Sequence, residues 1–125
     1  MKQLLIIVIF FAASCNSNDK QASPESPVTD SNINGEVLFK ANCASCHKPD
    51  KDFTGPALKG SLKRWSGDKK AMYAFIRNSM EQREINAYAK KVYEKWNKTS
   101  MTAFNLSDAE IDAIMNYVEN YKATR

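Results

Sequence analysis

The chain is poor in residues that bind metals or break helices: its 125 residues include one histidine, three cysteines, four glycines and four prolines. A zinc site needs four ligands, usually including a second pair of cysteines or histidines. Because neither a cysteine nor a histidine follows His47, the sequence does not predict a zinc site. Every proline lies at or before Pro56, and every glycine at or before Gly67. No stretch alternates apolar and polar residues as a half-buried strand would, so the sequence predicts an all-α domain.

Charge of either sign is also modest. Eighteen basic and fourteen acidic residues give a formal net charge of +4. The lysines are scattered along the chain, and no nucleic-acid-binding motif or aromatic-interleaved basic patch is present. We therefore expect most of them to form an ordinary solvated surface, with no nucleic-acid partner.

The most informative stretch is the run Cys43-Ala44-Ser45-Cys46-His47. Two cysteines separated by two residues, with histidine directly after, are typical of covalent haem attachment. Thiols about one helical turn apart can add to the two vinyl groups of one porphyrin. The adjacent imidazole is then carried under the ring, where it can bind iron. The sequence therefore predicts one haem c, held by Cys43 and Cys46, with His47 as an axial ligand.

Other interpretations of this pentapeptide explain less. A thioredoxin-like redox motif belongs to a strand–helix unit, and no strand pattern lies nearby. A structural disulfide between Cys43 and Cys46 remains possible but leaves His47 unexplained.

The first 14 residues predict an export signal. A lysine follows Met1, and residues 4–13 form an apolar run that is too short to span a bilayer. The end of this run, Ala12-Ala13-Ser14-Cys15, resembles a bacterial lipobox, which makes Cys15 the expected site of lipidation. Several acyl chains on one cysteine give durable anchoring. The alternative is a cleaved soluble signal that leaves an incidental, free Cys15.

Residues 15–31 are expected to be a flexible polar tether, and residues 32–125 the folded domain. The tether is rich in Ser, Asn, Asp and Gln and has too little apolar content to fold. Bacterial c-type haem is attached outside the cytoplasm, so the motif and the export signal agree. We therefore expect a periplasmic protein that is lipid-anchored to a bacterial membrane.

Apolar periodicity predicts four to five helices. The first runs from about residue 31 to the haem motif, with Asp30 or Ser31 as its cap, and Gly35 within it is explained if another helix crosses closely there. Further helices are expected at 68–79 and 84–97, and the last starts at the capping box Ser107-Asp108-Ala109-Glu110. Residues 48–60 and 98–105 are expected loops.

A sixth iron ligand is sought among the methionines after the motif. Met72 and Met115 lie on apolar helical stripes, where methionine usually fills the core. Met101 lies in the late loop and can turn its sulfur toward iron without distorting a helix. Met101 is therefore the preferred ligand, and Met80, at a helix end, is its main rival. Thioether ligation raises the reduction potential and suits electron transfer.

Together these residues carry a family resemblance. Residues 31–125 resemble a small class I cytochrome c: a first helix with Gly35 and Phe39, the haem motif, a Gly-Pro loop and a methionine loop. The last helix matches at Ile114 and Tyr117, where it crosses the first. The family often has proline directly after the ligand methionine, whereas this chain has Thr102.

The resemblance implies a cytochrome c fold packed around one haem. In the Gly-Pro loop, Gly55-Pro56-Ala57-Leu58, the proline packs near His47 and a loop carbonyl accepts the imidazole N–H. Pro56, Leu58 and Trp65 are the expected haem-pocket residues. Trp65 either donates its indole N–H to a haem propionate or packs on the haem edge.

The expected function is electron transfer by a single haem with fixed His47 and Met101 ligands, without enzyme activity. Expected partners are respiratory complexes, a terminal oxidase or reductase, or another carrier, met transiently by a monomer. One alternative is a haem enzyme or gas sensor with a labile sixth ligand. Another is a structural lipoprotein whose Cys43 and Cys46 form a disulfide.

Overall fold

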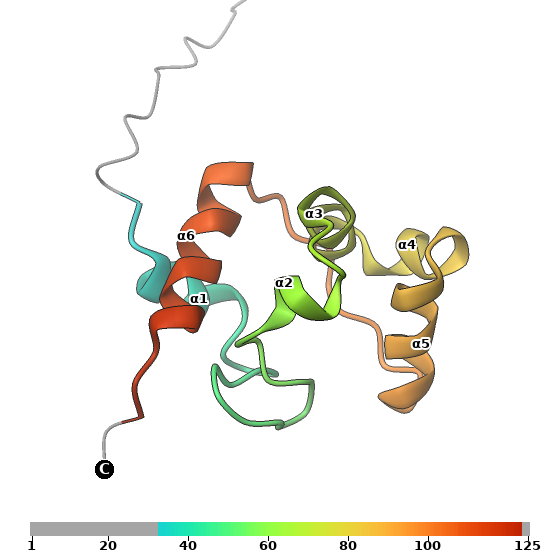
Figure 1. Cartoon of the computed structure of the whole chain (residues 1–125), viewed down its shortest axis with the longest axis horizontal. Helices are drawn as coiled ribbons and strands as arrows, with labels where there is room; N and C mark the ends of the chain where they lie inside the picture. Colours follow the sequence, from blue (N-terminus) through green and yellow to red (C-terminus); the bar gives the residue numbers. More distant parts are fainter. Residues whose placement is uncertain (1–32, 124–125) are drawn as a thin grey trace, which may run out of the picture.

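The computed structural model describes residues 33–123, and these form an all-α domain (Figure 1). The all-α prediction is confirmed. The described part has six helices instead of the four to five expected. They are α1 (Gly35–Asn42), α2 (Ser61–Arg64), α3 (Lys69–Arg77), α4 (Ser79–Ile85), α5 (Ala87–Lys95) and α6 (Asp108–Asn120). None of the described helices is both long enough and apolar enough to cross a membrane.

The first and last helices, α1 and α6, pack against each other at one end of the domain (Figure 1). A Cβ on Gly35 would overlap the backbone carbonyl of Ala113 and lie 3.1 Å from the Ile114 nitrogen. The Phe39 and Tyr117 rings pack beside this crossing, with centroids 5.5 Å apart. The close crossing predicted at Gly35 is therefore confirmed, because no side chain fits between the two backbones.

Polar side chains cap the N-termini of most of the described helices and thereby set the residues at which these helices begin. The Asn34 side chain accepts a hydrogen bond from the Val37 N–H, so α1 begins at Gly35, later than expected. The expected caps Asp30 and Ser31 lie outside the described residues. At the other end of the chain, the predicted capping box of Ser107 and Glu110 is present at the start of α6.

The helix predicted over residues 84–97 is instead two helices, α4 and α5. They are separated at Asn86, whose side-chain oxygen accepts from the Tyr88 and Ala89 N–H groups at 2.9 and 3.0 Å. This cap starts α5 anew and turns the chain. Ile85 is the last residue of α4 and is 73% exposed, although its helical spacing from Tyr88 in the sequence would place the two on one apolar face of a continuous helix.

Helices α2 and α3 lie between the α1–α6 pair and the α4–α5 pair, as Figure 1 shows. A solvent-exposed ion pair and a hydrogen bond tie α3 to α6: the buried Tyr73 donates its hydroxyl hydrogen to Asp112, which also pairs with Lys69 at 2.6 Å. Burial is the main factor that raises the pKa of Tyr73 to about 12, so this phenol remains a donor. This hydrogen bond and this ion pair hold α3 against α6.

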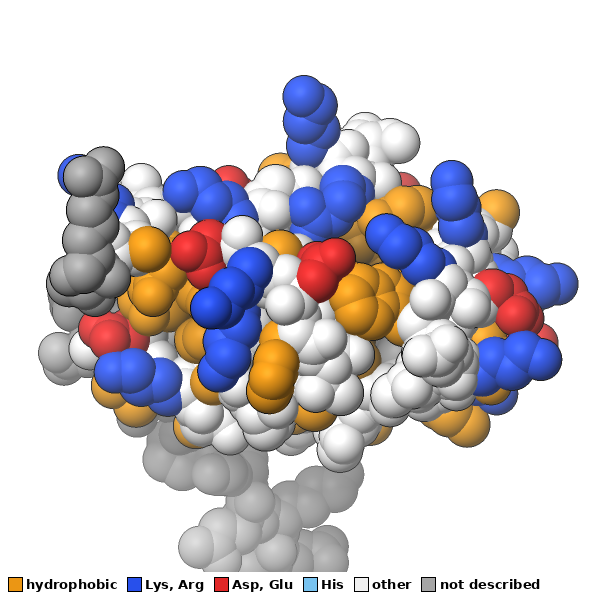
Figure 2. Space-filling view, turned by 90° about the horizontal axis from the view of Figure 1, so that it is seen from below, with side chains coloured by type: hydrophobic (Ala, Val, Ile, Leu, Met, Phe, Trp, Pro, Cys, Tyr) orange, Lys and Arg blue, Asp and Glu red, His pale blue; other side chains and the backbone are white. Residues whose placement is uncertain are grey.

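Basic side chains are spread over the surface, in keeping with the sequence pattern. On the face drawn in Figure 2, lysines and arginines lie among acidic, apolar and uncharged groups and do not gather in one patch. Several are held locally, such as Lys40, which pairs with Glu36 at 2.7 Å one turn earlier in α1. Such exposed pairs add little stability.

Candidate functional site

A cavity of about 410 Å³ lies at the centre of the described domain. Its walls come from the segment after α1, the loop before α2, helices α3, α5 and α6, and the loop before α6. Apolar and aromatic side chains dominate the walls, as in most cofactor sites. The residues predicted for a haem site all line it: Cys43, Cys46, His47, Pro56, Leu58, Trp65 and Met101. Cys15 lies outside the described residues.

His47 is held in place by the loop that follows it. Its ring is buried, and Nδ1 lies 2.8 Å from the Pro56 carbonyl oxygen. A carbonyl can only accept, so Nδ1 carries the proton and donates it, which leaves the Nε2 lone pair free. Burial lowers the pKa of His47, against an opposing effect of the Pro56 hydrogen bond. The imidazole is thus neutral and oriented as a metal ligand requires.

Gly55 makes room for this imidazole. A Cβ at this position would lie 2.5 Å from His47 Cε1 and 2.9 Å from Nδ1, closer than packing allows. The Gly55 N–H donates to the Cys46 carbonyl at 2.8 Å, which fixes the loop to the haem motif. The Gly-Pro sequence is therefore explained by contact with His47: the glycine supplies space and the proline supplies the acceptor.

The two cysteines of the motif border the same cavity and are both free thiols. The chain turns directly after α1, where the His47 N–H donates to the Cys43 carbonyl at 2.9 Å. Burial raises the pKa of Cys43 to about 11, so this thiol is protonated at neutral pH. Within residues 33–123, no three His, Cys, Asp or Glu side chains gather in a way that would hold a metal ion by themselves.

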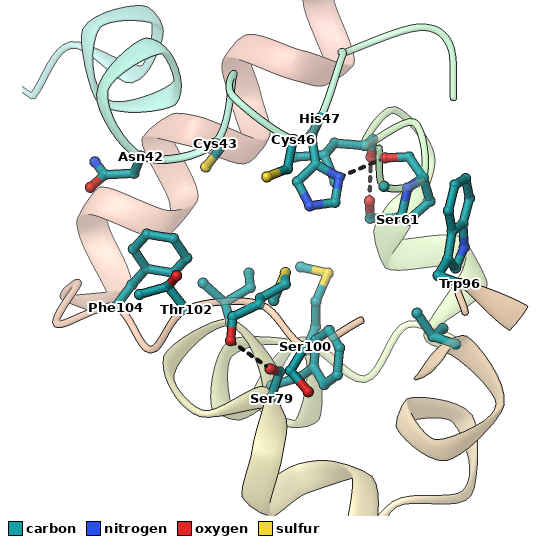
Figure 3. Close-up of a pocket in the computed structure, with 18 of the residues that line it drawn as sticks. Asn42, Cys43, Cys46, His47, Ser61, Ser79, Trp96, Ser100, Thr102 and Phe104 are labelled. Atoms are coloured by element: carbon teal, nitrogen blue, oxygen red, sulfur yellow. Dashed lines mark hydrogen bonds between the residues drawn. The ribbon is translucent and has the colours of Figure 1, made fainter. Parts of the chain in front are cut away.

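The loop that carries Met101 forms the wall opposite His47. Figure 3 shows His47, Cys43 and Cys46 on one side of the cavity, and Ser79, Ser100 and Thr102 on the other. Met101 lies between the last two in the chain, is half-buried and lines the cavity.

The other methionines differ from Met101 in their placement. Met80 is 51% exposed and is not among the lining residues. Met72 and Met115 do line the cavity, but they belong to α3 and α6, the helical positions expected for core methionines. Of the two candidates singled out from sequence, Met101 and Met80, only Met101 borders the cavity.

Trp65 is buried and forms part of an aromatic wall. Its ring contacts Phe75 at a centroid distance of 5.1 Å and meets Tyr88 edge-on at 4.8 Å. Such tilted and edge-on pairs fix ring positions. Phe75 and Tyr88 stand at apolar positions within the helices expected from the sequence, and helical spacing alone does not indicate that they line a cavity.

Two further residues of the site, Ser79 and Arg64, were not identified from the sequence. Ser79 is 4% exposed, and its hydroxyl donates to the Met101 carbonyl at 3.1 Å. The Arg64 guanidinium donates to the Lys59 carbonyl at 2.7 Å and to the Ala57 carbonyl, which braces the loop between Pro56 and α2. A lone serine belongs to no motif, so no sequence signal pointed to it.

This geometry agrees with comparisons to known proteins. A family model of cytochrome c matches residues 33–122. The chain belongs to the cytochrome c family. It is 33% identical over 88 residues to cytochrome c6 of Bumilleriopsis filiformis, covering 68% of this chain and 85% of that protein. It also resembles the solved structure of a cytochrome c from Rhodothermus marinus, with 32% identity and a TM-score of 0.57, covering 67% of this chain and 70% of that one.

The residues around the cavity fit the cofactor of this family. The apolar cavity is lined by two free cysteines, by a neutral imidazole with a free Nε2 lone pair, and by Met101, whose side chain carries a thioether. Such a donor set suits haem, whose iron takes nitrogen and sulfur axial ligands. As a cytochrome c, the protein carries covalently bound haem c and takes part in haem-based electron transfer.

Proposed function

We propose that this cytochrome c is a single-haem electron carrier of the bacterial cell envelope, with His47 and Met101 as axial ligands. Cys43 and Cys46 are the proposed thioether positions. The observation that carries the proposal is the contact between His47 Nδ1 and the Pro56 carbonyl oxygen, which makes Nδ1 the donor and leaves the Nε2 lone pair of this cavity-lining residue free. The Met101 loop forms the opposite wall.

The haem, when bound, supplies a one-electron couple. The residues of the chain orient the proposed iron ligands and form the surroundings of the cofactor. Pro56 holds His47 in one orientation, and the aromatic wall of Trp65, Phe75 and Tyr88 limits the access of water. With both axial positions taken by protein side chains, there is no open position for a substrate. The proposed role is therefore electron transfer without catalysis.

Carbon monoxide tests this proposal against a haem enzyme or gas sensor. We expect the reduced protein to bind carbon monoxide weakly and slowly near neutral pH, because Met101 must leave first. A spectrum of the ferric protein should show sulfur ligation, and a reductive titration should show one single-electron step. Fast, tight binding of carbon monoxide would contradict fixed ligands and favour the labile-site alternative.

The proposed partners are other redox proteins, bound transiently: respiratory complexes, a terminal oxidase or reductase, or another carrier. Electron-transfer contacts are commonly small, below about 1,200 Å² of total buried surface. A monomer of this size can present one haem edge to each partner in turn.

The proposed membrane anchor rests on sequence, since residues 1–32 lie outside the described part. An apolar run too short to span a bilayer ends in a lipobox-like sequence at Cys15, followed by a polar stretch. We propose that lipid on Cys15 holds the domain at the periplasmic face of a membrane.

The substitution Cys15→Ser tests the anchor. Wild-type protein should partition with membranes and enter the detergent phase. The variant should lack lipid and be either released or left as an unprocessed precursor, while haem stays attached at Cys43 and Cys46. Phase partitioning and a haem stain on a denaturing gel measure both properties. Wild-type protein that is wholly soluble and cleaved elsewhere would contradict the anchor but leave electron transfer untouched.

A further inference from the structure

The segment that carries Met101 has unusually little support from its own backbone. Residues 98–107 contain neither proline nor glycine, so no ring or special turn residue stiffens them. In the described structure, no backbone–backbone hydrogen bond involves residues 100–103. The position of Met101 must therefore depend on side chains from elsewhere in the fold.

One buried hydroxyl makes the contact to this backbone. Ser79 Oγ donates to the Met101 carbonyl at 3.1 Å, the bond drawn at Ser79 in Figure 3. Among the described residues, it is the one hydrogen bond to the backbone of residues 100–103. Ser79 is the first residue of α4, and the Asn78 side chain caps that helix by accepting from the Glu81 N–H at 3.2 Å. The donor thus sits on a fixed helix start.

Two arginines hold the segment on either side of this point. Arg83 donates to the Ser100 hydroxyl at 3.1 Å while its guanidinium lies over the Tyr93 ring, 4.3 Å from the centroid. Arg77 donates to the Leu106 carbonyl at 2.7 Å. These contacts fix the two ends of the segment, and Ser79 holds its middle at the residue that faces His47 across the cavity.

We propose that Ser79 is a positioning residue for Met101: it holds the ligand loop closed by binding the Met101 carbonyl. The inference rests on the proposed ligation of iron by Met101. Removing the hydroxyl leaves this carbonyl without its donor, and the loop then opens more often to give the carbonyl a water partner. Opening withdraws the sulfur from the cavity without unfolding the helices.

Ser79→Ala in the haem-loaded protein tests this role. One net hydrogen bond corresponds to roughly a fivefold change in an equilibrium constant, so the open fraction should rise about fivefold. Carbon monoxide binds the open form, so its apparent affinity for the reduced protein should rise by the same factor. The sulfur-to-iron absorption band should also disappear at a lower denaturant concentration than helical circular dichroism does.

Two variants control for a general loss of stability. Asn34→Ala removes the cap of α1, outside both the Met101 segment and the cavity lining, and it should weaken the fold while leaving carbon monoxide affinity at the wild-type value. Ser79→Thr keeps the hydroxyl, so its carbon monoxide affinity should stay within about twofold of the wild-type value. That change is smaller than the roughly fivefold change expected from losing one net hydrogen bond.

The outcomes separate this inference from the proposed function. If the wild-type protein has the sulfur band and Ser79→Ala matches Asn34→Ala in carbon monoxide affinity and band loss, the role of Ser79 is overturned and Met101 ligation stands. If the wild-type protein lacks the band and binds carbon monoxide tightly, Met101 ligation itself fails and this inference fails with it. The positioning role is supported if carbon monoxide affinity rises in Ser79→Ala but not in Ser79→Thr or in the helix-cap control.

Discussion

Met101→Ala should convert the protein from an electron carrier with two protein ligands on the iron into a protein that binds small ligands at the position vacated by Met101. The weak near-red sulfur-to-iron band should vanish, because Met101 is the one methionine among residues 33–123 that lines the cavity from a loop. The reduction potential should fall by a sizeable part of the roughly 0.8 V range that axial ligands span. Carbon monoxide should bind the reduced form readily, while haem remains attached through Cys43 and Cys46. Absorption spectra, a reductive titration and a haem stain measure these effects.

Met80→Ala is the matched control for this prediction. Met80 is half exposed and does not line the cavity, so the variant should keep the band, the potential and the weak response to carbon monoxide. If Met80→Ala lost the band while Met101→Ala kept it, the assignment of the sulfur ligand would be wrong.

Gly35→Ala should cause a large loss of stability although it adds only a single methyl group. The new Cβ would overlap the Ala113 carbonyl, so α1 and α6 would have to move apart. Overpacking of this kind typically costs about 1–3 kcal/mol, and here a backbone atom blocks relief by a rotamer change. The gain in helix propensity is at most about 1 kcal/mol. We expect the free energy of unfolding to fall by about 2 kcal/mol, measured by denaturant titration of the haem-loaded protein.

Val37→Ala provides a control on the same helix. Val37 is 59% exposed and lies away from the crossing, so its truncation should change the free energy of unfolding by no more than about 0.5 kcal/mol. A loss as large as that of Gly35→Ala would show that α1 is sensitive to any change, and the close crossing would no longer explain the effect.

The sequence was sufficient to predict those parts of the fold and site that depend on local chemistry. The attachment motif and the capping box of Ser107 each have a physical reason that can be read within a few residues, whereas Gly35 is explained by a helix that is distant in the sequence. Their arrangement around one cavity follows from the family resemblance, which the comparisons confirm. The roles of Met101 and of Cys15 stay predictions.

Periodicity alone could not locate the break between α4 and α5. Ile85, Tyr88 and Val92 follow one another at helical spacing, so an apolar pattern continues through a point where the chain turns. The signal that marks the break is Asn86, which is a strong cap but also occurs within helices. Ser79 was missed for a different reason: its partner lies 22 residues away, and only the folded chain brings the two together.

The pairing of α1 with α6 has a consequence for the order of events during biosynthesis. The two helices are separated by more than sixty residues, so their interface is a non-local contact that forms only after a long loop has closed. A chain made from its N-terminus exposes Cys43, Cys46 and His47 well before α6 exists. Because Ile111, Ile114 and Met115 of α6 also line the cavity, the cavity that surrounds this motif is incomplete until the final helix has docked.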